Sequence, residues 1–188
     1  MVPKEYYGRL FTKEQLPVDY HSEASTLESM IKVDKQLRCK RCYSRIEEDW
    51  QLPGGQYYCR ACIVFGRNQE GKELYYFPSK TSEIEFPVLK WLGELTPYQA
   101  EVSEKLLETY QKQKDSLVHA VTGAGKTEMI YKIVAYVLEN KGRVAIASPR
   151  VDVCRELFLR MQGDFTCSIS LLHAESEPYD GSPLVIAT

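Results

Sequence analysis

A glycine-rich segment runs Ala120-Val121-Thr122-Gly123-Ala124-Gly125-Lys126-Thr127. It follows the apolar run 117–121, which predicts a buried strand, and it leads into residues 126–140, which predict a helix. Glycines at 123 and 125 allow a tight turn in which successive N–H groups face an anion at the start of the helix. Lys126 can then reach the β and γ phosphates, and the Thr127 hydroxyl can enter a magnesium shell. The segment therefore predicts a site for ATP with Mg²⁺.

This segment departs from the usual signature at one position, because Ala120 stands where glycine is usual. The alternative is an ordinary loop that enters a helix. The strand expected before the segment and the amphipathic helix expected after it favour a phosphate-binding loop. The residues predicted to bind the nucleotide in this loop are Thr122, Gly123, Ala124, Gly125, Lys126 and Thr127.

Helices and strands are predicted to alternate around this loop. Thr96 and Pro97 supply an N-cap and a proline at the first position of a helix over 97–113. The later elements expected are a strand at 144–147, a helix at 152–161, and strands at 168–172 and 184–188. This order predicts an α/β fold in which helices cover a mostly parallel sheet.

Four of the six cysteines form two close pairs, Cys39-x-x-Cys42 and Cys59-x-x-Cys62, separated by sixteen residues. Two such pairs can place four thiolates around one ion, as in the tetrahedral Cys₄ sites of structural zinc. All four positions of the ion are then filled, so the zinc is predicted to be structural and not catalytic. An iron–sulfur cluster is the alternative, but this spacing around a turn favours zinc.

The rest of the N-terminal region is expected to be small and basic. Residues 1–36 predict an extended arm with a helix near 25–33, and residues 37–80 predict a small β-rich module held together by its metal. A linker with proline and serine at 78–87 places the next domain at 81–188. The net charge of -2 is unevenly distributed, because residues 32–80 hold ten Lys and Arg against six Asp and Glu. Lys40 and Arg60 are therefore candidates for contact with a phosphate backbone, although a solvated surface explains the charge equally well.

Two further motifs resemble elements of superfamily 2 helicases and translocases. Gln99, at the start of the helix that Thr96 caps, is similar to the glutamine that recognises adenine in that superfamily. Ser148 and Arg150, after the strand 144–147, resemble the motif that touches the nucleic-acid backbone. A simple helix cap and a strand end are the alternatives.

The chain as a whole resembles ComFA, the late-competence ATPase family of transformable Gram-positive bacteria. The resemblance is carried by motifs in a fixed order: Gly8-Arg9-Leu10, Tyr58-Cys59-Arg60-x-Cys62, Leu74-Tyr75-Tyr76-Phe77, Leu95-Thr96-Pro97-x-Gln99, His119 to Met129, and Ala147 to Cys154. It implies a RecA-like ATPase lobe in a cytoplasmic motor, at the inner face of the membrane, that pulls single-stranded DNA through an uptake channel. It also implies a ComFC-type partner and a homo-oligomer for the full-length protein.

The same resemblance leads us to expect a fragment. The acidic motif that holds magnesium and the second lobe that supplies an arginine finger do not occur before Thr188. We therefore expect residues 1–188 to bind zinc and to bind nucleotide weakly, without hydrolysing ATP. Two alternatives to the motor stay open at this point: a zinc-dependent adapter with a regulatory nucleotide site, and a primosome-type replication-restart helicase.

Overall fold

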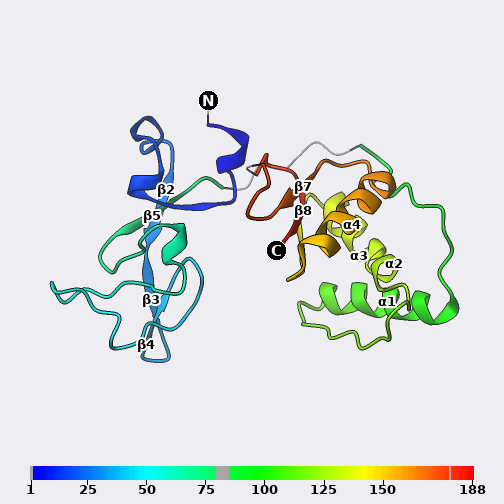
Figure 1. Ribbon diagram of the computed structural model, residues 1–188, viewed down its shortest axis with the longest axis horizontal. Coiled ribbons are helices and arrows are strands. Elements are labelled where there is room, and N and C mark those ends of the chain that lie inside the picture. The colour runs from blue at the N-terminus through cyan, green and yellow to red at the C-terminus, as the bar shows by residue number, and fades with distance from the viewer. Residues whose placement is uncertain (1, 79–84, 178) are drawn as a thin grey trace. The chain divides into compact units, whose positions relative to one another are not determined.

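The computed structural model describes residues 2–78, 85–177 and 179–188 of the chain. The chain divides into two compact units, Met1–Lys80 and Thr81–Thr188, which are drawn from blue to green and from green to red in Figure 1. Among the described residues, no helix is both long enough and apolar enough to cross a membrane.

The first unit is built from two small antiparallel sheets. One has the order β1-β5-β2, formed by Leu10–Thr12, Glu73–Tyr76 and Ser25–Glu28. The other is a hairpin of β3 (Met30–Val33) and β4 (Gln36–Cys39). The described residues of this unit also form short 3₁₀ helices: η1 (Lys4–Tyr6) before β1, η2 (Lys13–Gln15) and η3 (Val18–Tyr20) between β1 and β2, and η4 (Ile63–Phe65) between β4 and β5.

Two predictions for the N-terminal residues are wrong. The segment 1–36 is not a separate arm. Its strands β1 and β2 lie on either side of β5, which comes from the C-terminal end of the same unit. The helix expected near 25–33 is replaced by strands, since β2 pairs with β5 and β3 pairs with β4. Asp34 and Lys35, with φ of 49° and 64°, form the two-residue turn of the β3–β4 hairpin. That left-handed turn matches the twist of paired strands and cannot be part of a helix.

The second unit is an α/β fold, as predicted. Its three strands are all parallel in the order β6-β8-β7, formed by Val144–Ala147, Leu184–Ala187 and Ile169–Leu172. The helices are α1 (Pro97–Gln111), α2 (Lys126–Met129), α3 (Tyr131–Glu139) and α4 (Val151–Asp164). A single core joins α3 and α4 to the sheet through fully buried side chains such as Leu138, Met161 and Ile186. Near the sheet, Asp180 accepts hydrogen bonds from the side chains of Ser170 and Ser182.

Two details of this unit differ from the prediction. Residues 117–121 are not a strand, and Leu117 and Val121 are 95% and 78% exposed. An apolar run becomes a strand only where a neighbouring strand supplies backbone partners, and none of the described strands pairs with this run. The helix expected over 126–140 is divided at Ile130 into α2 and α3.

Candidate metal centre and phosphate-binding loop

The four cysteines of the two pairs converge on one point in the first unit. Cys39 ends β4, the other three lie in the loops that follow, and their Sγ atoms all lie within 4.8 Å of one another. The Cys39–Cys62 and Cys42–Cys59 sulfur pairs are 3.7 and 3.5 Å apart. Thiolates at roughly 2.3 Å from one tetrahedral ion lie about 3.8 Å from each other. The cluster therefore has the dimensions of a four-thiolate metal site.

Two polar side chains that were not predicted from the sequence to contact the sulfurs support them. The buried Asn68 side chain donates to the Cys39 sulfur at 3.1 Å and to the Ser29 carbonyl at 2.8 Å. The Arg41 guanidinium donates to the Cys62 sulfur at 3.1 and 3.3 Å. Such donors orient thiolate ligands and offset their charge. The position of Arg41 between the first two cysteines could have suggested its role, whereas no feature of the sequence distinguishes Asn68.

Proton binding by the cysteines depends on their surroundings. Burial raises the pKa of Cys59 and of Cys62. Burial also acts to raise the pKa of Cys42, but hydrogen bonds from the side chain and backbone of Ser44 outweigh it and lower the value to about 7. Because a metal binds thiolates, it must displace the protons of the two buried thiols, and its affinity should rise with pH.

The glycine-rich loop of the second unit closes on itself through its lysine. Gly123 and Gly125 have φ of 81° and 73°, a left-handed conformation that favours glycine. The Lys126 ammonium group donates to the carbonyls of Ala120 and Val121 at 2.9 and 2.7 Å. Thr127 follows in the first turn of α2. The lysine side chain therefore lies across the loop, and the two glycines allow the backbone of that loop to turn.

Gln99 reaches this loop from a distant part of the sequence. Its Oε1 accepts from the Thr96 N–H at 2.8 Å, which completes the capping box of α1. Its Nε2 donates to the Ala124 carbonyl at 2.9 Å. A Cβ atom on Gly125 would lie 2.4 Å from that Nε2. The structure thus brings Gln99 into contact with the predicted phosphate-binding residues. A side chain at position 125 would displace the Gln99 amide and would be strained by the φ of 73°.

The residues predicted to contact nucleic acid are divided between the two units of the chain. Ser148 and Arg150 lie between β6 and α4, where the Arg150 guanidinium forms an exposed ion pair with Asp152 at 2.5 Å. In the first unit, Arg60 is paired with Asp49 at 3.2 Å and also donates to the Tyr58 hydroxyl. Lys40 is exposed beside the cysteine cluster. Both ion pairs are exposed to solvent, which screens them, so Arg60 and Arg150 can exchange their partners for a phosphate.

Comparison with known proteins relates this chain to two curated sequences. It is 54% identical over 187 residues to the competence protein ComFA of Streptococcus pneumoniae (strain ATCC BAA-255 / R6), a match that covers 98% of this chain. The chain belongs to the ComFA family. It is also 33% identical over 186 residues to the competence protein ComFA of Bacillus subtilis (strain 168), a match that covers 95% of this chain. The chain spans 42% and 40% of the lengths of these two ComFA proteins.

A second comparison concerns the α/β unit of the chain. Residues 92–176 match the family described as type III restriction enzyme, res subunit. The matched range contains Gln99 and the whole glycine-rich loop, so it supports a helicase-like ATPase domain in this unit. No solved structure matches the chain significantly.

Proposed function

We propose that the full-length protein is an ATP-dependent motor that moves along single-stranded DNA during DNA uptake. The observation that carries this proposal is the contact of Gln99 with the loop that contains Lys126, within the residues that match the res-subunit family. Adenine recognition and phosphate binding would thereby share one site. The ComFA relationship supports the competence role, and it is also our reason for proposing a ComFC-type partner, a homo-oligomer and a place at the inner face of the membrane.

Each residue of this loop has a proposed part. The Lys126 ammonium group would exchange the carbonyls of Ala120 and Val121 for the β and γ phosphates. Thr127 would place its hydroxyl in the Mg²⁺ shell, and the backbone between Thr122 and Gly125 would donate to phosphate oxygens. Gln99 would use the remaining N–H and the remaining lone pair of its amide to hydrogen-bond the adenine edge. Bound Mg²⁺ would neutralise charge on the phosphates.

For the cysteine cluster we propose structural zinc. Four sulfurs within 4.8 Å supply a complete thiolate set, which suits zinc and leaves no position for water. The metal would hold together a unit whose second core consists mainly of the cysteines themselves with Met30 and Ile46. Its role would be to fix the loops that present the basic residues of this unit to DNA.

The nucleotide proposal can be tested with one lysine variant and a matched control. Binding of a fluorescent ATP analogue with Mg²⁺ should be lost in Lys126→Ala. It should be unchanged in Lys105→Ala, because Lys105 forms only an exposed pair with Glu101 on α1. Unchanged nucleotide affinity in Lys126→Ala would refute the assignment.

A further inference from the structure

The first unit exposes three consecutive apolar side chains on a fixed backbone. Ile63, Val64 and Phe65 of η4 are 43%, 81% and 67% exposed. Their loop is held by Arg41, which donates to the carbonyls of Cys62, Phe65 and Gly66 at 2.8, 2.5 and 2.5 Å. Because the loop is anchored, its apolar side chains are exposed as part of the folded structure. A cluster of exposed apolar side chains of this kind marks an interaction surface.

A second anchor ties this loop to the N-terminal strand region. Gln15 donates from Nε2 to the Phe65 carbonyl at 2.8 Å. The Phe65 backbone is therefore held from both sides, by the cysteine cluster through Arg41 and by η2 through Gln15. A backbone that is ordered before its ligand arrives reduces the conformational entropy lost on binding.

The hollow beside Phe65 is positively charged. It has a volume of 720 Å³, and its lining includes Phe65, Phe11, Arg9 and Arg41 but no carboxylate. The Arg9 guanidinium lies 5.1 Å from the centroid of the Phe11 ring and donates to the Glu5 backbone carbonyl. Among the ion pairs of the described residues, none involves Arg9. Its charge is therefore available to an anionic ligand.

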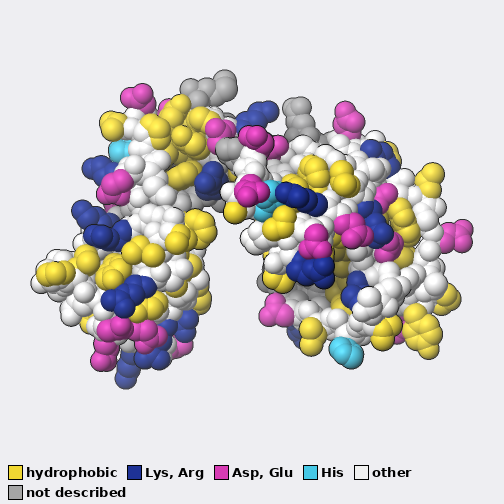
Figure 2. Space-filling model, in the orientation of Figure 1, with side chains coloured by type: hydrophobic (Ala, Val, Ile, Leu, Met, Phe, Trp, Pro, Cys, Tyr) yellow, Lys and Arg dark blue, Asp and Glu magenta, His cyan; other side chains and the backbone are white. Residues whose placement is uncertain are grey.

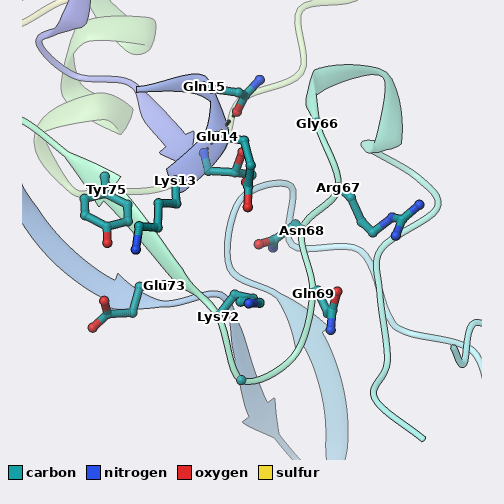
Figure 3. A pocket seen from close by; sticks show the side chains of 12 residues that line it. Lys13, Glu14, Gln15, Gly66, Arg67, Asn68, Gln69, Lys72, Glu73 and Tyr75 are labelled. Atoms are coloured by element: carbon teal, nitrogen blue, oxygen red, sulfur yellow. Dashed lines mark hydrogen bonds between the residues drawn. The ribbon is translucent and has the colours of Figure 1, made fainter. Parts of the chain in front are cut away.

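A neighbouring cavity of 880 Å³ shares Gln15 with this hollow but is lined by charges of both signs. Its charged lining residues are Lys13, Glu14, Arg67, Lys72 and Glu73. Figure 3 shows the Glu14 carboxylate pointing into this cavity, whereas the Arg67 side chain points away from it. A hydrogen bond from the Glu14 backbone and another from Thr12 lower the pKa of Glu14, so the carboxylate stays charged at neutral pH. The hollow beside Phe65 differs from this cavity because no carboxylate lines it.

We propose that this hollow binds one nucleotide of single-stranded DNA, with the base stacked on Phe65 and the adjoining phosphate against Arg9. The proposal rests on the proposed function, because it assumes that the chain binds single-stranded DNA. An aromatic face beside cations without carboxylates is the combination that binds unpaired bases without sequence preference. Figure 2 shows hydrophobic side chains lying among Lys and Arg side chains on one face of the first unit. Arg60 would have to leave Asp49 to bind a phosphate, whereas none of the described ion pairs involves Arg9.

The test measures binding of residues 1–188 to a fluorescent oligothymidylate by anisotropy. Phe65→Ala should weaken binding about tenfold, and Phe65→Trp should restore it, because stacking needs a flat ring. Arg9→Ala should reduce the slope of log affinity against log salt by about 0.7, the value for one contact to a single strand. Phe86→Ala is the matched control, because Phe86 is an equally exposed ring, at 70%, in the second unit.

Each result either supports or overturns the inference. Equal DNA binding by wild type, Phe65→Ala and Arg9→Ala overturns it and leaves the motor proposal intact. Equal losses in Val64→Ala and Phe65→Ala without rescue by Phe65→Trp also overturn it, because they show that no base stacks on the Phe65 ring. Wild type that binds nucleotide but shows no salt-sensitive DNA binding refutes both the site and the DNA part of the proposed function. The metal content of each variant checks that the loop is folded.

Discussion

Asn68 provides the sharpest test of the cysteine cluster. Its side chain is 1% exposed and donates to the Cys39 sulfur at 3.1 Å and to the Ser29 carbonyl at 2.8 Å. In Asn68→Ala the Ser29 carbonyl keeps the hydrogen bond from the Lys40 N–H at 2.9 Å. The Cys39 sulfur loses its amide donor. The substitution therefore acts mainly on the charge that this sulfur carries as a metal ligand.

The expected magnitude follows from that one hydrogen bond. A hydrogen bond to a charged group contributes about 1.5–3 kcal/mol. Each 1.4 kcal/mol is a factor of ten in an equilibrium constant, so zinc affinity should fall by about tenfold to a hundredfold. Loss of a supporting partner at other metal sites has an effect of about the same size. The four sulfurs themselves remain, so zinc should still bind with a stoichiometry of one.

Competition with a chromophoric chelator measures this change. Gln69→Ala is the matched control, because Gln69 carries the same amide group but its side chain lines the cavity of Figure 3. Its zinc affinity should equal that of wild type. Equal zinc affinity in Asn68→Ala and wild type would refute the reasoning. Iron with visible absorbance in the purified protein would overturn zinc as the metal.

Two further substitutions test the second unit. Gly125→Ala adds a Cβ 2.4 Å from Gln99 Nε2 at a residue whose φ is 73°. The substitution should abolish nucleotide binding. It should also destabilise the unit by more than the strain of a left-handed residue alone, which is about 1–2 kcal/mol. Urea denaturation measures the loss of stability, and Gly71→Ala is the control because Gly71 has a φ of 75° and no atom lies within 4 Å of the added Cβ. Equal losses of stability in the two variants would contradict the clash. Burial acts to raise the pKa of Asp180, but its two serine donors outweigh this and lower it. The wild-type carboxylate should therefore stabilise the fold above the unfolded pKa of about 4, and its advantage over Asp180→Asn should vanish as the pH falls below it. An advantage that persists unchanged at pH 2 would show that the charge plays no part.

The spacing of motifs was sufficient to predict that the four cysteines lie together and that the glycine-rich segment turns at its glycines. Cysteine pairs converge on a point because each Cys-x-x-Cys turn brings its own two sulfurs together, a local property of the chain. The positive φ of Gly123 and Gly125 is equally local, since only glycine adopts it without strain. The order of strands and helices after residue 140 also followed from apolar periodicity, because parallel sheets bury both faces of their strands.

The partners of each segment could not be predicted in this way. Residues 25–33 have a helix-compatible pattern, yet β5 lies some forty-five residues later in the chain and supplies a ladder that local propensity cannot reveal. Residues 117–121 have a strand-compatible pattern, but no described strand pairs with them. Whether such a segment becomes a strand is decided by its hydrogen bonds to a distant segment. The entropy lost in closing the intervening loop depends on the length of that loop and not on the local sequence.

The sequence by itself determined which residues are the candidates for metal and nucleotide binding: four cysteines, a glycine-rich loop with its lysine, and a capping glutamine. Tertiary structure alone decided what supports and surrounds them. It placed Asn68 and Arg41 on the sulfurs, brought Gln99 to the Ala124 carbonyl, and left Phe65 exposed beside Arg9. The physical reason is that the type of a ligand and the conformation of the backbone are properties of short segments. The hydrogen-bond partners of the ligands, the burial of side chains and the presence of an unpaired charge arise only when distant segments meet.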